Sequence, residues 1–575
     1  DVYEVGMSYL GMKILYYILN ERKDTYCERV FAPWPDMEEL MRKNNISLYG
    51  LESKDPIKSF DFIGFTLQYE MSYTNILNML NLAGLSVRAS DRGEEDPIIM
   101  CGGPCAYNPE PLFDIADMFA LGESEEQMNE IMDLYKEYKG RKKEFLRAVC
   151  HIDGIYVPSL YDVNYNEDGT IREFKPLYDD VPPKITKRII KNFNDVEYPD
   201  KIIVPYTDIV HDRITLETFR GCTRGCRFCQ AGMIYRPVRE KKTSKLLETA
   251  DKLIKSTGYS EVSLTSLSIC DYSDLKNLVV NFINEHEKDK VGLSLPSLRI
   301  DSFSVGLINE IQKVRKTGLT FAPEAGSQRM RDVINKGVTE KNLMDSVSSA
   351  FESGWSTIKL YFMIGLPYET MEDVKEIAHL SQKVVDEYFK VPKDKRKKGL
   401  KVTVSTAIFV PKPFTPFQWT AQIKMEDVKK EIRELRSSIS SRHIVYNWHE
   451  SPLSYLEAVF ARGDRRLCEV LIKAYEKGAK FDSWSEYFNF DLWEEAFKEC
   501  NVDGDFYAYR NRSYEEILPW DFIDIGVNKK FLIEENEKAK RAEVTPDCRL
   551  GCKNCGVNVN LGGECFESAV FNKVQ

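Results

Sequence analysis

The most informative segment of the chain reads Arg220-Gly-Cys-Thr-Arg-Gly-Cys-Arg-Phe-Cys-Gln230, and it directly follows the strand-like run Ile214-Thr-Leu-Glu-Thr-Phe219. Its three cysteines, Cys222, Cys226 and Cys229, have the spacing C-x3-C-x2-C, which lets one tight loop point three sulfurs at a single cuboidal iron–sulfur cluster. Three thiolates on a four-iron cluster leave one iron open to an outside ligand. A zinc site would normally take its fourth ligand from the protein.

Strand-like runs alternate with helical patterns on both sides of this loop. The expected strands lie near Thr215 and at Glu261–Leu264, Gly292–Leu295, Gly318–Phe321, Thr357–Ile364 and Lys401–Val410. Six strands with helices between them predict an α/β fold built on a partial (β/α)6 barrel of the TIM type. In such barrels the chemistry lies on the loops that follow the strands.

The motif C-x3-C-x-aromatic-C after the first strand of a partial barrel resembles the signature of the radical S-adenosylmethionine (SAM) superfamily, and the likeness extends over roughly residues 210–420. The resemblance implies a [4Fe–4S] cluster on Cys222, Cys226 and Cys229, S-adenosyl-L-methionine on the open iron, and a 5′-deoxyadenosyl radical. Phe228, between the last two cysteines, would shield the cluster from water. A zinc knuckle is the alternative interpretation.

Later segments resemble SAM-binding segments of methylthiotransferase- and Elongator-like members of the superfamily. The loop after the second strand, Thr265-Ser-Leu-Ser268, lacks the family's Gly-Gly-Glu, and Phe321-Ala-Pro-Glu-Ala-Gly-Ser327 follows the fourth strand. The fifth strand ends in a Gly-Leu-Pro turn, which the resemblance places close to the adenine. The predicted SAM contacts are Ser266, Ser268, Glu324, Ser327, Gly365 and Pro367. Gly326-Ser327 also reads as a helix N-terminus, and the two interpretations are compatible.

Residues 1–125 alternate short apolar strands with helices and predict a Rossmann-like, doubly wound domain whose first strand lies upstream of the sequence. Cys101-Gly-Gly-Pro-Cys-Ala106 and Gly122-Glu-Ser-Glu125 are similar to the cobalamin-binding-like domain fused to many radical enzymes. No histidine precedes His151, so we do not expect an imidazole from this domain to ligate cobalt. Cobalamin binding and a vestigial domain that only shapes the site remain alternatives.

The C-terminal tail contains a second group of cysteines. Cys548-Arg-Leu-Gly-Cys-Lys-Asn-Cys555 repeats the C-x3-C-x2-C spacing, and Cys565 follows. Cys548, Cys552, Cys555 and Cys565 could satisfy either a tetrahedral zinc ion or a second iron–sulfur cluster, and spacing does not distinguish them. A tail this short needs a metal to hold a core.

These patterns predict five segments: the cobalamin-binding-like domain 1–125, a linker region 126–205, the radical SAM barrel 206–420, a helical region 421–540 and a metal-binding tail 541–575. The net charge of −11 argues against broad binding to polyanions. No apolar run approaches the roughly 18–20 residues that span a bilayer. The absence of a leader and the clustered thiols among 14 cysteines lead us to expect a cytoplasmic protein.

The predicted function is a radical SAM enzyme, with methyl transfer favoured and methylthio transfer as a related possibility. Its expected partners are an electron donor such as flavodoxin or ferredoxin and a substrate such as tRNA or a ribosome-associated protein, which the resemblance suggests only by analogy. The alternative function is a metal-stabilised, RNA-associated binding protein with structural zinc in both cysteine loops. The substrate and the oligomeric state are not predicted.

Overall fold

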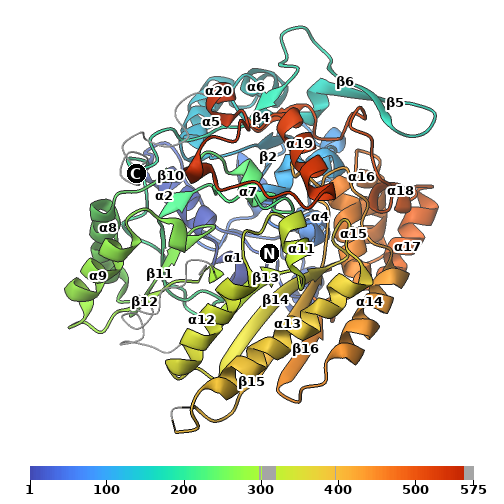
Figure 1. Ribbon diagram of the computed structural model, residues 1–575. Helices are drawn as coiled ribbons and strands as arrows, with labels where there is room; N and C mark the ends of the chain where they lie inside the picture. The colour runs from blue at the N-terminus through green and yellow to red at the C-terminus, as the bar shows by residue number, and fades with distance from the viewer. Residues whose placement is uncertain (297–298, 301–318, 395, 562–575) are drawn as a thin grey trace. The chain divides into compact units, whose positions relative to one another are not determined.

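The computed structural model describes residues 1–296, 299–300, 319–394 and 396–561 (Figure 1). The chain divides into two compact units. Unit 1 comprises Asp1–Asp212, Leu456–Ala508 and Arg512–Gly526, and unit 2 comprises Arg213–Tyr455, Tyr509–Asn511 and Val527–Gln575. Each unit is therefore assembled from segments far apart in the sequence.

Unit 1 is built on a four-stranded sheet in the order β1-β2-β3-β4. The strands β1 (Phe62–Thr66), β2 (Ile98–Gly102) and β3 (Met118–Ala120) are parallel, and β4 (Ile155–Tyr156) runs antiparallel to β3. Ile98, Ile99 and the whole of β3 are buried, as expected for strands covered on both faces. The Rossmann-like prediction is confirmed for the α/β character of this unit.

Helices from both ends of the sequence complete unit 1. The N-terminal ones are α2 (Leu10–Glu21), α4 (Tyr73–Leu82), α5 (Glu125–Tyr138) and α6 (Lys142–Val149). The late helix α16 (Leu467–Glu476) packs on α4 and on α17 (Phe490–Glu499). Thr74 donates a buried hydrogen bond of 2.7 Å to Asp482, which fixes the late segment against α4.

The described part of unit 2 contains seven parallel strands in two sheets. The first sheet has the order β12-β11-β8, with β8 (Ile214–Glu217), β11 (Glu261–Thr265) and β12 (Gly292–Ser294). The second sheet has the order β13-β14-β15-β16, with β13 (Leu319–Glu324), β14 (Thr357–Ile364), β15 (Lys401–Ile408) and β16 (Ile444–Trp448). These strands match the six predicted for a TIM-type barrel and add one.

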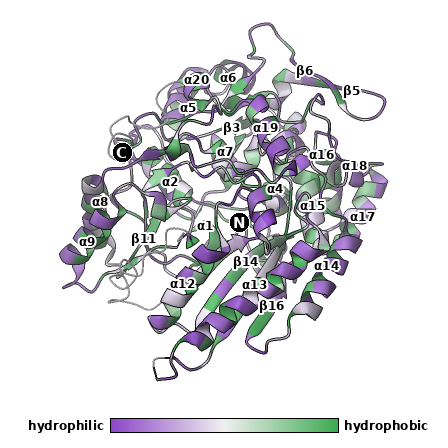
Figure 2. Cartoon of the chain, viewed as in Figure 1, coloured by the Kyte–Doolittle hydropathy of each residue, from purple (hydrophilic) through white to green (hydrophobic). Residues whose placement is uncertain are grey.

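A helix follows most of these strands and covers the outer face of the sheets. α8 (Thr243–Thr257) and α9 (Leu275–His286) are the helices that follow β8 and β11 of the first sheet. Figure 1 shows α12 (Glu340–Glu352), α13 (Met371–Lys390) and α14 (Met425–Ser438) lying along the second sheet. In Figure 2 the strands of the second sheet carry green segments, and the outward faces of its helices are largely purple. The core between them is built from fully buried aliphatic side chains such as Ile358, Val402 and Val384, whose burial drives this packing.

The extra strand lies in the predicted helical region, residues 421–540. Besides the helices of this region, Ile444–Trp448 forms β16 and pairs in parallel with β15. Its residues are β-branched or aromatic at four of five positions, which favours a strand. Most of them are exposed or partly exposed, as at a sheet edge, so the apolar pattern was weak.

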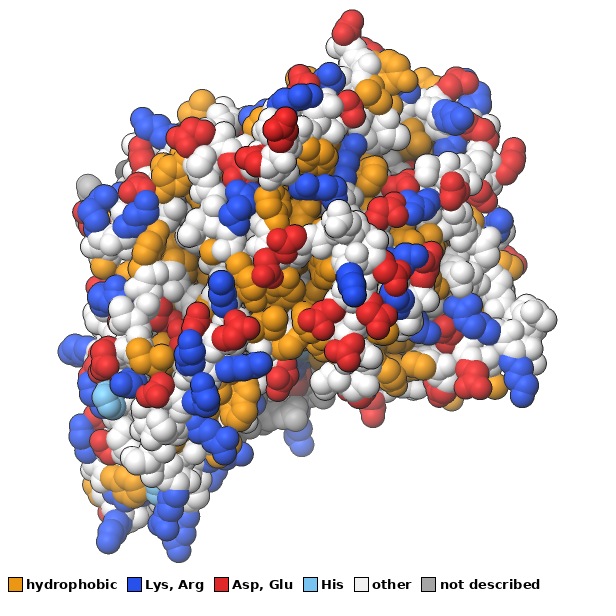
Figure 3. All heavy atoms as spheres, turned by 90° about the vertical axis from the view of Figure 1, so that its right-hand side faces the viewer, with side chains coloured by type: hydrophobic (Ala, Val, Ile, Leu, Met, Phe, Trp, Pro, Cys, Tyr) orange, Lys and Arg blue, Asp and Glu red, His pale blue; other side chains and the backbone are white. Residues whose placement is uncertain are grey.

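Two surface properties complete the description. Among the described residues, no helix is both long and apolar enough to cross a membrane. On the face shown in Figure 3, Lys and Arg side chains are mixed with Asp and Glu side chains.

Candidate active site

The cluster loop, residues 220–230, begins at the carboxyl end of β8 and is closed at its base. β9 (Phe219–Arg220) pairs in antiparallel with β10 (Arg239–Glu240). Gly221 has a φ of +88°, and a Cβ there would meet the Pro237 carbonyl oxygen at 2.5 Å. Glycine is therefore required at this turn. The loop ends in the short helix α7 (Ala231–Ile234).

The three thiols of the loop lie close enough to influence one another. Burial first, and then Cys226, raises the pKa of the Cys222 thiol. Burial, Cys226 and Cys222 together raise the pKa of Cys229 to about 12. The Gly232 amide donates to the Cys229 sulfur at 3.4 Å. If the three thiolates bound the irons of a cluster, the positive irons would offset the cost of ionising these thiols together. The donor set therefore fits a [4Fe–4S] cluster.

Cations face this group of thiols although the chain is acidic overall. The positive charge of Arg299 acts to lower the pKa of Cys222, and that of Lys336 acts to lower the pKa of Cys229. Each cation therefore favours the thiolate form. Arg299 also donates to the Lys336 carbonyl oxygen at 3.0 Å. Local positive charge of this kind suits an anionic thiolate cluster. Among the described residues, no three His, Cys, Asp or Glu side chains are grouped as ligands of one metal ion.

A buried arginine fixes the cluster loop to its surroundings. Arg227 is fully buried and forms an ion pair of 3.1 Å with Glu535 of α19 (Lys529–Lys540). It also donates to the carbonyl oxygens of Val333 at 2.8 Å and Glu543 at 2.7 Å. Removing one partner of such a network is costly because the other charge stays buried. The conformation of the loop is therefore held from several sides.

Phe228 joins the cluster loop to two of the predicted SAM-binding segments and to the segment after β15. It packs against an apolar cluster that contains Ala325 after β13, Leu366 in the Gly-Leu-Pro turn, and Phe409 and Phe417 after β15. These residues come from the exits of successive parallel strands, which meet at one edge of the sheet. The predicted motifs are therefore brought together in unit 2.

Ser266 and Ser268 lie after β11, beside the cluster loop. Ser266 carries a buried hydroxyl that no described residue hydrogen-bonds. A buried polar group without a partner points to a ligand or a water that would satisfy it. Ser268 is buried and is followed by Asp271 on the same turn. The Ser268 hydroxyl is also buried without a hydrogen-bond partner in the described part of the chain, so both serines carry a polar group that a ligand would satisfy.

Glu324 and Ser327 already have protein partners. Glu324 has a φ of +69° and forms an ion pair of 3.0 Å with Lys336. Ser327 is the N-cap of α11 (Gln328–Val333): its hydroxyl oxygen accepts from the Met330 amide at 3.1 Å and donates to Asp373 at 2.6 Å. The helix N-terminus interpretation of Ser327 is confirmed, and its role as a SAM contact stays a prediction.

The Gly-Leu-Pro turn, residues 365–367, directly follows the last residue of β14. Gly365 has a φ of +72°, and a Cβ there would meet the Ile423 side chain at 2.3 Å. Its amide donates to Glu369 at 2.6 Å. Burial raises the pKa of Glu369 well above its usual value and that of Glu431 to about 7. Two protonatable carboxyls therefore support this turn.

The tail loop, residues 547–556, contacts the cluster loop directly. The Cys548 amide donates to the Thr223 carbonyl oxygen at 3.3 Å, and the Thr223 hydroxyl donates to Asp547 at 3.0 Å. Cys552 is exposed and Cys555 buried. The fourth predicted ligand, Cys565, lies outside the described residues.

The ionic network between these loops was not predicted from the sequence. Asp271 accepts from Arg224 at 2.9 Å and from Arg549 at 2.7 Å. Although burial opposes its charged form, Arg224 and Arg549 hold the pKa of Asp271 at about 2. An acidic residue near the end of the loop after β11 was the only signal for it in the sequence.

The corresponding edge of the sheet in unit 1 is occupied by the chain itself. A Cβ on Gly103 would meet the Leu67 carbonyl oxygen at 2.8 Å, and one on Gly122 would meet that of Arg188 at 2.1 Å. The Asn108 amide group donates to the carbonyl oxygens of Ala461 at 3.1 Å and Gly463 at 3.0 Å. These glycines therefore allow close approach of backbone to backbone.

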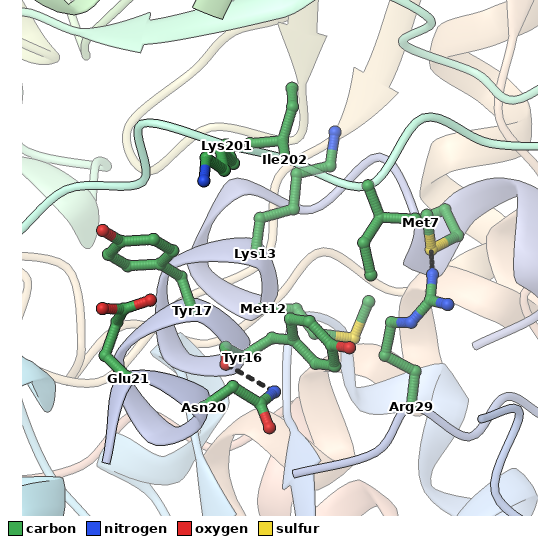
Figure 4. Close-up of a pocket in the computed structure, with 11 residues that line it drawn as sticks. Met7, Met12, Lys13, Tyr16, Tyr17, Asn20, Glu21, Arg29, Lys201 and Ile202 are labelled. Carbon is green, nitrogen blue, oxygen red and sulfur yellow. Dashed lines mark hydrogen bonds between the residues drawn. The ribbon is translucent and has the colours of Figure 1, made fainter. Parts of the chain in front are cut away.

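Unit 1 also contains a small pocket beside α2 (Figure 4). Its volume of about 250 Å³ is below the roughly 300–1,000 Å³ usual for small-molecule sites. Arg29 at one side is already paired with Glu52 at 2.7 Å. The lining residues are Met7, Met12, Lys13, Tyr16, Tyr17, Asn20, Glu21, Arg29, Lys201, Ile202 and Ile203. The pocket is too small for a corrin.

Two family models match the chain. The model for radical SAM proteins, N-terminal, matches residues 11–158, and the model for the radical SAM superfamily matches residues 216–381. The second match contains the cluster loop and the Gly-Leu-Pro turn. Together the two segments make up more than half of the 575 residues. The chain belongs to the radical SAM superfamily, and it is an enzyme that uses a [4Fe–4S] cluster and S-adenosylmethionine.

Similar sequences include three prokaryotic proteins. An uncharacterised protein of Methanocaldococcus jannaschii is 29% identical over 75% of this chain and 84% of its own. An uncharacterised methyltransferase of Pyrococcus horikoshii is 22% identical over 51% of this chain and 60% of its own. The ribosomal protein uS12 methylthiotransferase of Caldanaerobacter subterraneus is 22% identical over 55% of this chain and 64% of its own.

Two solved structures are also similar. The radical SAM methyltransferase TsrM from Kitasatospora setae, with tryptophan and a SAM analogue bound, has a TM-score of 0.49 and 10% identity over 86% of this chain and 97% of that one. OxsB, with aqua-cobalamin and SAM bound, has a TM-score of 0.48 and 13% identity over 94% of this chain and 77% of that one. At this level of similarity neither structure assigns a ligand to this chain.

Proposed function

We propose that this protein is a radical SAM methyltransferase whose [4Fe–4S] cluster is ligated by Cys222, Cys226 and Cys229. The observation that supports it most is the group of three neighbouring thiols on one loop, of which Cys226 is buried and the other two are partly buried, in a chain similar to a methyltransferase and a methylthiotransferase. When bound, the reduced cluster supplies one electron to S-adenosylmethionine and so yields the 5′-deoxyadenosyl radical.

The residues around the loop would orient the cofactor. In this proposal the Ser266 hydroxyl, which has no partner among the described residues, accepts a hydrogen bond from the amino group of S-adenosylmethionine. The turn at Gly365 and Pro367 passes the adenine, with Glu369 holding the Gly365 amide in place. Phe228 and its apolar neighbours exclude water from the cluster, which protects a radical from side reactions.

Partners follow from the chemistry. Radical SAM enzymes need an external reductant, and we propose a flavodoxin or ferredoxin in the cytoplasm. We propose a nucleic acid or ribosomal protein as substrate because one similar protein is named for methylthiolation of ribosomal protein uS12. The mixed charges on the face in Figure 3 suit a specific contact better than non-specific binding to a polyanion.

The N-terminal domain has two proposed roles: a cobalamin site for the methyl carrier, or a scaffold that shapes the active site. The contacts at Gly103, Gly122 and Asn108 in unit 1 are made with the chain's own backbone, which does not fit a corrin at this edge. We therefore assign no step to cobalamin. Cobalt bound by anaerobically purified protein at one per chain would restore that role.

The proposal is tested with reconstituted protein, a strong reductant and S-adenosylmethionine labelled in its methyl group. We expect 5′-deoxyadenosine in every reaction and label transferred to tRNA or to ribosomal protein when these are supplied separately. Formation of 5′-deoxyadenosine without label in either fraction would reject group transfer to these substrates. Zinc in place of iron and no 5′-deoxyadenosine would instead favour the RNA-associated binding protein.

Methylthio transfer is a second candidate, favoured by the cysteine-containing tail loop that contacts the cluster loop. It differs in its product, since sulfur as well as a methyl group reaches the substrate. Reconstitution with ³⁵S-labelled sulfide distinguishes the two reactions. Sulfur label in the product favours methylthio transfer, and methyl label alone favours methyl transfer.

A further inference from the structure

The tail loop repeats the cysteine pattern of the cluster loop. Cys222-Thr-Arg-Gly-Cys-Arg-Phe-Cys229 and Cys548-Arg-Leu-Gly-Cys-Lys-Asn-Cys555 share the pattern C-x2-G-C-x2-C. The glycine before the second cysteine has a positive φ in both loops, +74° at Gly225 and +125° at Gly551. One residue after the third cysteine, each loop enters a short helix, α7 in one and α20 (Val557–Asn560) in the other. The two loops therefore share their cysteine and glycine spacing, while their backbones differ: Cys548–Leu550 forms a 3-10 turn, and Gly556 before α20 has a φ of +95° where Gln230 before α7 has −61°.

The two loops are also joined to each other. Beside the Cys548–Thr223 and Thr223–Asp547 hydrogen bonds, Arg224 pairs with Asp547 at 3.2 Å. Asp271 binds Arg224 of the cluster loop and Arg549 of the tail loop. Thr223 and Asp547 are neighbours of Cys222 and Cys548 in sequence, so these contacts bring the first cysteines of the two loops close together.

A buried arginine lies between the two sets of thiols. Arg236 is 4% exposed and donates to the Gly232 carbonyl oxygen at 2.9 Å. Its guanidinium lies close enough to the Cys555, Cys548 and Cys222 thiols to interact with each of them. The same guanidinium thus faces thiols of both loops. A permanent cation there stabilises anionic sulfur on either side.

We propose that the tail loop holds a second iron–sulfur cluster on Cys548, Cys552 and Cys555, adjacent to the cluster of the first loop. The inference rests on the cluster ligands assigned under the proposed function. Three cysteines within eight residues match the spacing of iron–sulfur loops, in which each thiolate takes a different iron. Zinc sites more often combine one C-x2-C pair with a distant second pair.

The test is the metal content of the full-length protein, reconstituted anaerobically with iron and sulfide and measured together with zinc. We expect about eight irons per chain in the wild type and about four in Cys552→Ser. Cys552 is exposed, so this substitution leaves no cavity in a core. In Cys226→Ser the count also falls to about four, but the remaining iron no longer responds spectroscopically to S-adenosylmethionine. Cys500→Ser, at an isolated cysteine, keeps eight.

Three outcomes would overturn the inference. Four irons and one zinc, with the zinc lost in Cys552→Ser, would make the tail a zinc site. Four irons without zinc in the wild type would leave the tail loop metal-free. Four irons whose spectrum changes in Cys548→Ser would make a tail cysteine the fourth ligand of the first cluster. Eight irons without 5′-deoxyadenosine would reject the proposed function but keep the second cluster.

Discussion

The carboxyl ends of the parallel strands have different chemistry in the two units. In unit 1 the loops after β1 and β2 satisfy one another, and Asn108 donates to backbone carbonyl oxygens of Ala461 and Gly463. In unit 2 the same edge carries the partly buried Cys222 and Cys229 thiols, whose pKa values are raised, and the Ser266 hydroxyl, which has no partner in the described part of the chain. The edge in unit 1 is filled by backbone, apart from the buried Asn108 Oδ1, whereas the thiols in unit 2 indicate where a ligand binds.

The largest expected effect comes from removing a thiol at the edge in unit 2. Cys226→Ser should abolish 5′-deoxyadenosine formation, because two thiolates do not hold the cluster in the geometry that leaves one iron open. The product is measured chromatographically after a reaction with excess reductant. Cys468→Ser in unit 1, buried but isolated, serves as the control and should retain activity. Activity in Cys226→Ser close to that of the wild type would remove the cluster loop from the mechanism.

Substitutions at the edge in unit 1 are expected to reduce the stability of the fold. Gly122→Ala places a Cβ against the Arg188 backbone at a φ of +107°, which should lower the free energy of unfolding by about 4 kcal/mol. Gly84→Ala has a φ of +69° but open space around it and should cost about 1 kcal/mol. Denaturant unfolding compares the two variants. Equal losses would show that the close contact at Gly122 adds nothing to the strain.

The turn at Gly365 should make stability depend on pH. Burial raises the pKa of Glu431 from 4.5 to about 7, so the unfolded chain ionises before the folded one. The free energy of unfolding should therefore fall as pH rises from about 4.5 to 7, by up to about 3 kcal/mol. Glu431→Gln should flatten this fall, and Glu434→Gln, exposed on the same helix, should not. Identical pH profiles for the two variants would contradict the assignment.

The smallest expected effect concerns the link between the two cysteine loops. Asp271→Asn removes the carboxylate shared by Arg224 and Arg549 and should lower the free energy of unfolding by about 2 kcal/mol. Asp251→Asn, which breaks an exposed pair with Lys255, should cost less than about 0.5 kcal/mol. Thermal unfolding of both variants provides the comparison. A cost for Asp271→Asn no larger than that for Asp251→Asn would mean that the network does not hold the loops together.

The sequence predicted those parts of the molecule that depend on local spacing. Strands such as Thr357–Ile364 were readable because apolar runs are properties of short segments, and the ligand role of the three cysteines in the cluster loop stays a prediction from their spacing. Ser327 was readable as an N-cap for the same reason. The strand β16 was missed because its half-exposed residues lie among strongly helical patterns.

Contacts between distant segments could not be predicted in this way. Thr223 and Asp547 are separated by 324 positions, and the sequence of neither segment indicates that the two are in contact. The buried pair Arg227–Glu535 spans 308 positions. Such pairs form because the fold places both groups where water is excluded, and a charged residue in the sequence does not reveal whether it will be buried. The role of Arg236 between the two loops became visible for this reason only in the structure.

The central claim is that the cluster on Cys222, Cys226 and Cys229 keeps one iron for S-adenosylmethionine. Electron–nuclear double resonance on the reduced protein, with S-adenosylmethionine labelled with ¹⁵N at its amino group, tests this directly. The account predicts a hyperfine coupling between the cluster and the labelled nitrogen, absent in Cys226→Ser. A reduced cluster that shows no such coupling, with a fourth cysteine on its last iron, would contradict it.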